Sequence, residues 1–352
     1  MEKLDRVRRS IGALDRAVMA KTQSRLDNLT KPLGSLGRLE ELIKSITGMT
    51  GSETPPLANK VIFTMAGDHG VTDEGVSPYP KAVTAQMVYN FLRGGAAINV
   101  LARHAGARVV VVDMGVAEDI KAGAGLIIRK INYGTRNMVK GPSMTRAEAL
   151  KAIGSGIDIF ESEFKKGIDI VCTGEMGIGN TTAASAITAL FTGRPVKEVT
   201  GRGAGLDDKA LAGKIRIVEK ALDVNRPDPE DAIDVLMKVG GFEIGGLAGI
   251  ILAASARRVP VVIDGFISGA AALVAYKLHP TVKDYMIASH CSVESGHKFI
   301  LAELGLKPVL DLDLRLGEGT GSALALCLID ASAKILSEMA TFESASVSKK
   351  VS

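Results

Sequence analysis

The chain has 352 residues, of which 46% are hydrophobic, so it can bury a sizeable core and form one large domain or two. Its net charge of +4 is small for this length, Trp is absent and only 4% of residues are aromatic, which argues against nucleic acid as a partner. Three widely spaced cysteines give no disulfide or zinc pattern, and a charged start with no apolar run of about 18 residues predicts a soluble cytoplasmic protein without membrane contacts.

The first segment, residues 1–49, is predicted to be helical because its apolar residues recur on one face. Residues 31–35 interrupt the pattern, and Ser35 is positioned to cap a helix over residues 36–46. Residues 50–59 contain two prolines and are predicted to be a linker at a domain boundary.

Short apolar strands alternate with Ala- and Gly-rich helices from residue 60 onward. Near-continuous β-branched runs are typical of strands that a parallel sheet buries on both faces. The alternation predicts an α/β fold, with a Rossmann-like parallel sheet and helices on both faces. An excursion over residues 116–137 precedes a helix that Ser143 or Thr145 caps. The predicted strands are residues 61–65, 108–114, 168–173, 259–263 and 285–288, and the predicted helices include residues 82–104, 209–222, 230–239, 240–258 and 322–339.

Residues 168–184, IDIVCTGEMGIGNTTAA, predict a strand, a glycine loop and a helix start. Gly174 and Gly177 let the backbone approach a ligand closely, and free N–H groups at the helix start, Asn180, favour an anion. The glycine spacing matches neither a Walker A loop nor the dinucleotide fingerprint. Glu175 inside the loop indicates a phosphorylated substrate whose other end becomes positive or gives up a proton; the alternative is a structural loop acid.

A second glycine loop, residues 201–208, contains Gly203 and Gly205 and ends at Asp207, which is predicted to cap the next helix. The two glycines are ordinary turn residues unless a phosphate lies there, and Lys214 on the helix can reach such a phosphate. Ligands of parallel sheets bind outside the carboxyl ends of the strands. The polar residues predicted at these ends are Asp68, His69, Glu175, Asn180, Asp264, Ser289 and Ser292.

Glu318 stands between two glycines just before the last helix, so its carboxylate lies on a loop that can approach a ligand. Partial desolvation would raise its pKa and suit it to general-base catalysis. The alternative is an acid that the helix dipole stabilises.

Two groups of residues invite a metal prediction, and neither supports one. Asp68 and His69 diverge in an extended loop and lack a third ligand at a recognisable spacing. His290, Cys291 and His297 have the same weakness. We therefore predict no metal.

Six motifs occur in order along the chain: KPLGSLGRLE (31–40), GDHGV (67–71), TGEMGIGNTT (173–182), VGGFEIGGLAG (239–249), IDGF (263–266) and RLGEGTGSALAL (315–326). Taken together, they resemble those of the nicotinate-nucleotide–dimethylbenzimidazole phosphoribosyltransferase (CobT) family, from residue 29 to about residue 340. The resemblance implies transfer of the phosphoribosyl group of nicotinate mononucleotide to dimethylbenzimidazole or a related lower-ligand base, giving α-ribazole 5′-phosphate and nicotinate in assembly of the cobalamin nucleotide loop. It implies no cofactor.

The resemblance also implies roles for individual residues. Glu318, the glutamate of RLGEG, would be the general base that takes the benzimidazole N–H proton while the other ring nitrogen attacks C1′ of the ribose. Glu175 would position the base or stabilise positive charge on the ribosyl ring. Contacts with the substrates are predicted for Gly174, Gly177, Asn180, Gly203, Gly205, Lys214, Asp264, Ser292, Tyr79 and Met87.

The family pattern implies a large α/β ribotide-binding domain over residues 59–304 and a small helical domain formed by residues 1–58 with 305–352. It also implies a homodimer in which the small domain of one subunit closes the cavity of the other. The chain departs from the pattern at Tyr79 and Met87, where the family has small or polar residues. Hydroxylated or unsubstituted benzimidazoles, purines and phenols therefore stay open as acceptors.

Three other functions fit the sequence less well. A nicotinamide dehydrogenase would need GxGxxG after the first strand, where this chain has AGDHGV. A transferase that uses pyrophosphate-activated ribose would need an acidic run at a strand end, whereas Asp207 and Asp208 open a helix. A non-catalytic binding protein for nucleotides or cobamide precursors would keep the glycine loops without requiring Glu318.

Overall fold

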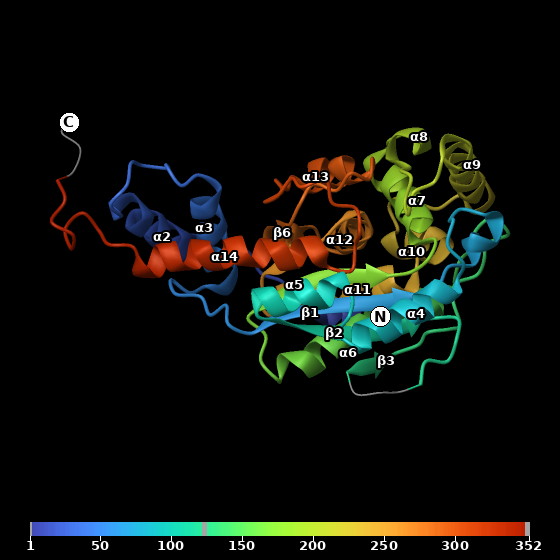
Figure 1. Ribbon diagram of the computed structural model, residues 1–352, viewed down its shortest axis with the longest axis horizontal. Coiled ribbons are helices and arrows are strands. Elements are labelled where there is room, and N and C mark those ends of the chain that lie inside the picture. The colour runs from blue at the N-terminus through green and yellow to red at the C-terminus, as the bar shows by residue number, and fades with distance from the viewer. Residues whose placement is uncertain (1, 122–124, 349–352) are drawn as a thin grey trace.

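The computed structural model describes residues 2–121 and 125–348. Six parallel strands form one sheet in the order β3-β2-β1-β4-β5-β6 (Figure 1). From β1 the chain adds strands first toward one edge of the sheet (β2, β3) and then, from β4, toward the other. This strand order is that of a doubly wound Rossmann-like sheet, so the predicted fold class is confirmed. The strands are β1 (Lys60–Gly67), β2 (Ala107–Gly115), β3 (Leu126–Ile128), β4 (Ile170–Met176), β5 (Val261–Ile263) and β6 (Met286–Ala288).

Helices cover both faces of the sheet (Figure 1). One face is covered by α5 (Ala97–Ala105) and α14 (Thr320–Glu338). The other is covered by α11 (Phe242–Ala256) and α12 (Phe266–Leu278), and α6 (Arg146–Phe164) packs on α11. The central strands β1 and β4 and most of β2 are therefore buried on both sides, as their continuous apolar sequences require, whereas the edge strand β3 is partly exposed.

Small residues bring α6 and α11 into backbone contact. A Cβ at Gly156 would lie 2.0 Å from the carbonyl oxygen of Gly246, and one at Gly249 would lie 2.1 Å from that of Ile153. No larger residue fits at these positions without separating the helices. This explains why the sequence of α11 reads as a small-residue helix without a polar face.

A helical unit lies beyond one end of the sheet, where α2 (Arg16–Asn28) and α3 (Arg38–Thr50) pack on the second half of α14 (Figure 1). The first helix, α1 (Glu2–Arg9), packs instead on α6 and α11. The remaining helices are α4 (Ala82–Leu92), α7 (Asn180–Thr192), α8 (Val196–Val199), α9 (Asp208–Asn225), α10 (Ala232–Val239) and α13 (His297–Leu304), with 3₁₀ turns η1 (Gly70–Glu74) and η2 (Pro280–Tyr285).

Two predicted caps are confirmed. Thr145 forms a capping box with Glu148 at the start of α6, and Asp207 accepts a hydrogen bond from the Ala210 amide at the start of α9. The predicted cap at Ser35 is wrong, because the residue before α3 is Gly37.

The structure also corrects two elements. The predicted helix over residues 82–104 is two helices, α4 and α5, because the chain turns at Gly94, whose φ is +76°. The excursion over residues 116–137 contains a short strand, β3, that the sequence analysis missed, and its residues 122–124 lie outside the described part of the chain.

Within residues 2–121 and 125–348, only α14 is long and apolar enough to cross a membrane by length and composition. Half of its 18-residue window is buried inside the protein, and the core helix of a soluble protein has the same properties.

Candidate active site

A cavity of about 630 Å³ opens at the carboxyl ends of β4, β5 and β6. It brings together most of the residues that the sequence analysis assigned to the site. Those on its wall are Tyr79, Met87, Glu175, Gly177, Asn180, Gly203, Ser292 and Glu318. Gly174, Gly205, Lys214 and Asp264 do not line it.

Glu318 is held in an uncommon backbone conformation on the cavity wall. Its φ is +63°, between glycines whose φ values are +85° and +99°, and a left-handed non-glycine residue costs on the order of 1–3 kcal/mol. The hydroxyl of Thr64 donates to its carbonyl oxygen at 3.1 Å, and the amide of Ile98 donates to its Oε2 at 3.2 Å. Burial raises the pKa of Glu318, and the hydrogen bond from the Ile98 amide acts in the opposite direction.

Close packing against β4 stabilises this loop. A Cβ at Gly174 would lie 2.3 Å from the carbonyl oxygen of Glu318, and one at Gly317 would lie 2.2 Å from Oε1 of Glu175. Gly174 therefore lets the loop of Glu318 pack against the sheet, and it does not itself line the cavity.

Asp264 holds the same loop from behind. Its two carboxylate oxygens accept hydrogen bonds from the amides of Gly319, at 3.1 Å, and Ser322, at 3.0 Å, at the start of α14. Burial raises its pKa to about 7, and these amides act in the opposite direction. Asp264 therefore holds the backbone directly after Glu318 in place.

Glu175 lies at the end of β4 and its Oε2 accepts a hydrogen bond from the side chain of Asn180. Burial, followed by the charge of Asp264, raises the pKa of Glu175 to about 8. In the free protein the carboxyl group is therefore largely protonated at neutral pH. A cationic ligand beside it would favour the charged form.

Helix starts and one buried lysine favour an anion in the cavity. The N-termini of α7 and α12 open onto it through Thr181 and Phe266. Lys214 is buried behind the wall, and its Nζ donates to the hydroxyl of Thr181 at 2.8 Å and to the carbonyl of Gly201 at 3.2 Å. Burial lowers its pKa to about 8.

The predicted pair of Asp68 and His69 does not line the cavity. His69 Nε2 lies 2.7 Å from Oε1 of Glu243, and both side chains are buried. The sequence analysis did not single out Glu243, because it lies inside an apolar helix. Cavity residues that it did not assign to the site include Val83, Ile178, Thr181, Phe266, His290, Glu294, Leu314, Arg315 and Leu316.

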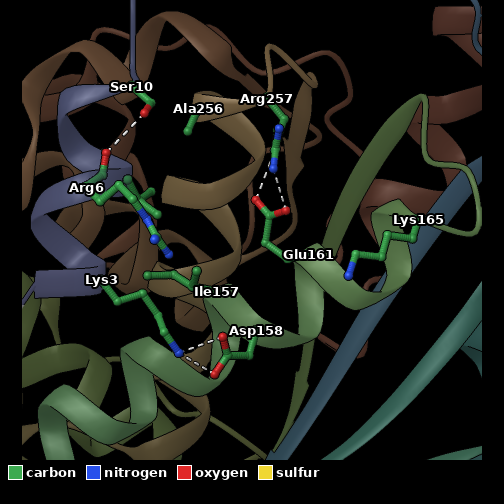
Figure 2. Close-up of a pocket in the computed structure, with 10 residues that line it drawn as sticks. Lys3, Arg6, Ser10, Ile157, Asp158, Glu161, Lys165, Ala256 and Arg257 are labelled. Atoms are coloured by element: carbon green, nitrogen blue, oxygen red, sulfur yellow. Dashed lines mark hydrogen bonds and ion pairs between the residues drawn. The ribbon is translucent and has the colours of Figure 1, made fainter.

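A second cavity, of about 480 Å³, lies between α1, α6 and the end of α11. Figure 2 shows two ion pairs between charged side chains on its wall. Lys3 Nζ is 2.5 Å from Oδ2 of Asp158, and Arg257 Nη2 is 2.8 Å from Oε2 of Glu161. These pairs are at the surface, where ion pairs contribute little.

Comparison with known proteins shows close relatives over nearly the full length. A sequence model of a phosphoribosyltransferase family matches residues 11–347. A protein of Geobacter sulfurreducens is 59% identical over 336 residues (96% of each chain), and one of Desulforudis audaxviator is 57% identical over 349 residues (99% of each). Both are named nicotinate-nucleotide–dimethylbenzimidazole phosphoribosyltransferase.

Solved structures agree. The crystal structure of CobT from Thermus thermophilus superimposes with a TM-score of 0.91 and 44% sequence identity, covering 95% of this chain and 100% of the other. A second structure, of the phosphoribosyltransferase of that name from the same organism, has a TM-score of 0.91 and 43% identity, covering 96% of this chain and all of the other.

The doubly wound sheet and the cavity at its carboxyl edge define an α/β protein of the class that binds its ligands at this edge. The chain belongs to the phosphoribosyltransferase family that these relatives represent, and it is a pentosyl-transferring enzyme. The family predicted from the sequence motifs is thereby confirmed.

Proposed function

We propose that this enzyme transfers the phosphoribosyl group of nicotinate mononucleotide to dimethylbenzimidazole or a related base, giving α-ribazole 5′-phosphate and nicotinate in the assembly of the cobalamin nucleotide loop. The names of its relatives support this reaction. The observation that carries it is the buried carboxylate of Glu318, held in a left-handed loop on the wall of an anion-favouring cavity.

In the proposed mechanism, one nitrogen of the benzimidazole attacks C1′ of the ribose. The C1′–N bond to nicotinate breaks, and its electron pair neutralises the pyridinium nitrogen. Glu318 takes the proton from the other benzimidazole nitrogen, so the product ring is neutral and the configuration at C1′ inverts from β to α. The leaving group is already cationic, so the protein needs only to align the reactants and remove one proton.

Several groups would hold the ribotide. The amide of Thr181 at the start of α7 and the loop at Gly203 would offer backbone N–H groups to the phosphate, with Lys214 supplying charge behind Thr181. The amide of Asn180 already donates to the carbonyl of Gly177 at 3.1 Å, so Asn180 would contribute through its side chain on the wall. Ser292 is fixed by its amide, which donates to Nδ1 of His297 at 2.9 Å. Gly174 would act indirectly, by letting the Glu318 loop pack against β4, and Asp264 would act through the same loop. Gly177 lies on the cavity wall, and Gly205, whose φ is +110°, would shape the loop that carries Gly203.

The acceptor would lie against the apolar part of the wall. Tyr79, Val83, Met87 and Ile178 line the same cavity as Glu318. Flat aromatic rings bind well between such side chains. Tyr79 and Met87 are therefore the residues that we propose select among benzimidazoles, purines and phenols.

We propose a large domain over residues 59–304, a small domain of residues 1–58 with 305–352, and a homodimer in which each small domain closes the partner's cavity. Leu33 is 74% exposed and Leu316, on the cavity wall, is 58% exposed. A partner subunit would cover such apolar surface. We further propose a cytoplasmic protein that binds neither nucleic acid nor membranes, in keeping with its modest net charge of +4.

Incubation of the protein with nicotinate mononucleotide and a panel of azole, purine and phenol acceptors tests the reaction, with products identified by mass spectrometry. We expect nicotinate and an α-ribotide of at least one azole. Binding of nicotinate mononucleotide without product from any acceptor would favour the non-catalytic nucleotide-binding alternative.

A further inference from the structure

We propose that His290 recognises the sugar of the substrate, by accepting a hydrogen bond at Nε2 from a hydroxyl of the ribosyl ring. This inference rests on the proposed function, because it concerns the same cavity and the same ribotide. His290 follows β6, and its side chain is buried although it forms part of the cavity wall.

The hydrogen bonds of Ser289 determine where the imidazole carries its proton. Its hydroxyl lies 3.2 Å from the carbonyl oxygen of Asp264 and 2.9 Å from Nδ1 of His290. A carbonyl oxygen can only accept, so the single hydroxyl proton is donated to Asp264. Ser289 must then accept from His290, which places the imidazole proton on Nδ1 and leaves a lone pair on Nε2.

Packing holds the ring with this lone pair toward the cavity. A Cβ at Gly321 would lie 2.0 Å from Nδ1, so the ring fills the space beside the first turn of α14. On the other side, a Cβ at Gly265 would lie 3.6 Å from Nε2, and Gly265 is itself on the cavity wall. Within the described part of the chain Nε2 has no hydrogen-bond partner. Burial lowers the pKa of His290 to about 4, so the ring is neutral and Nε2 stays an acceptor at neutral pH.

An acceptor on the wall discriminates among the parts of the ribotide. Ionised phosphate and the nicotinate carboxylate present only acceptor oxygens, whereas the ribose hydroxyls are donors. The other donor among the reactants is the benzimidazole N–H, which the proposed mechanism directs to Glu318. His290 lies against Gly321, three residues after Glu318, so it is close to the loop that would take the proton of the attacking ring.

The same contacts would link the bound sugar to the loop that carries Glu318. His290 donates to Ser289, Ser289 donates to the backbone of Asp264, and the Asp264 side chain holds the amide of Gly319. A hydroxyl bound at Nε2 would therefore be linked to the Glu318 loop through His290, Ser289 and Asp264, with one hydrogen bond at the backbone carbonyl of Asp264 and the next at its carboxylate.

Dissociation constants measured by isothermal titration calorimetry test the proposal, with nicotinate mononucleotide and its 2′-deoxy and 3′-deoxy analogues. In the wild type, loss of one of these hydroxyls should weaken binding about tenfold. His290→Asn keeps an amide near Nδ1 and removes the acceptor at Nε2. It should bind the intact ribotide about tenfold more weakly and lose nothing further with that analogue.

His290→Gln places an amide oxygen near Nε2 and should retain most of the wild-type sensitivity to deoxygenation. Ser289→Ala gives a second readout, because without its acceptor the ring can adopt the other tautomer, and the same hydroxyl should then contribute less. His104→Asn, at an exposed histidine on α5, is the matched control and should bind as the wild type does.

Equal losses for the deoxy analogues in the wild type and in His290→Asn would overturn the proposal, as would wild-type binding that neither deletion weakens. Should His290→Asn fail to fold by circular dichroism, the Gln and Ala variants decide in the same way. Failure of the wild type to bind or turn over nicotinate mononucleotide would instead refute the proposed function, so the two failures are distinct.

Discussion

The two cavities of this enzyme have similar numbers of charged side chains on their walls, but the acids of the second cavity are partly exposed and paired, whereas the glutamates at the sheet edge are buried and, among the described residues, unpaired. Around the second cavity, Lys3 pairs with Asp158 and Arg257 with Glu161, and these side chains remain partly in water (Figure 2). At the sheet edge, Glu175 and Glu318 are buried, and no cation forms an ion pair with either among the described residues. Their pKa values rise because desolvation disfavours the charged form.

The comparison teaches that the number of charged side chains does not distinguish the candidate active site from the second cavity, whereas desolvated carboxylates held by the backbone do. Glu318 itself has a left-handed backbone conformation. Its loop is held by a hydrogen bond to Asp264 and by close packing against Gly174. Such an arrangement costs stability and persists only where the surrounding structure enforces it. At the second cavity, Glu161 lies within the regular helix α6, and among the described residues no left-handed loop holds it.

The largest effect should come from the base. Glu318→Gln should lower kcat by about 10²- to 10⁴-fold, because it removes the proton acceptor and keeps the shape of the side chain. The dissociation constant for nicotinate mononucleotide should change little, since the ribotide is held elsewhere in the cavity. Steady-state kinetics and calorimetry measure the two quantities.

Glu161→Gln is the matched control for that substitution, because it removes a carboxylate from the second cavity, and it should leave kcat unchanged. Turnover retained by Glu318→Gln, or lost by Glu161→Gln, would break the distinction between the two cavities.

A smaller effect is expected for the buried cation. Lys214→Met should raise the KM for nicotinate mononucleotide about 10- to 100-fold, since charged hydrogen bonds are worth about 1.5–3 kcal/mol. Its Nζ now donates to Thr181 and Gly201 behind the phosphate-favouring loop. Lys3→Met, at the second cavity, should change KM by less than about twofold. Equal effects in the two variants would refute the phosphate role of Lys214.

The free energy of unfolding should depend on pH, because burial raises the pKa values of Glu175 and Asp264. Folding raises the pKa of Glu175 to about 8, so between about pH 4.5 and 8 the folded state keeps a proton that the unfolded state releases. The free energy of unfolding should therefore fall as pH rises through this window, by about 1.4 kcal/mol for each pKa unit of difference. Asp264, with a pKa of about 7, acts in the same direction.

Denaturant unfolding of the wild type and of Glu175→Gln, measured between pH 5 and 8.5, checks this expectation. The variant should show a shallower decline, because its amide does not titrate. An identical slope would mean that Glu175 is ionised throughout that range.

The smallest effect should come from breaking a surface ion pair. Lys3→Ala should change the free energy of unfolding by less than about 1 kcal/mol, because exposed pairs are screened by water and salt. Thermal unfolding of this variant and of Asp158→Ala measures the effect. A loss of several kcal/mol would show that the second cavity is more than a surface hollow.

Sequence patterns predicted much of the fold because strands, caps and glycine loops are local. Asp207 caps its own helix, and Glu318 stands between glycines that can be read directly. Contacts between distant segments could not be predicted in this way. In the sequence Glu243 is part of an apolar helix. In the structure its carboxylate lies within hydrogen-bonding distance of His69, which follows β1.

Gly174 illustrates the same limit. Its place in a glycine loop suggested contact with a ligand, but the neighbour that requires the missing side chain is the carbonyl of Glu318, 144 positions later in the chain. His290 was visible as a polar residue after a strand, and only the hydrogen bonds of Ser289 indicate how it can act.

The central claim, that Glu318 is the base for the incoming ring, is tested most directly by a crystal structure of the enzyme with nicotinate mononucleotide and a poorly reactive benzimidazole analogue. The account predicts a carboxylate oxygen of Glu318 within about 3.2 Å of the ring N–H, with the other ring nitrogen facing C1′. A ring bound in the cavity with its N–H well beyond hydrogen-bonding distance of Glu318 would contradict it.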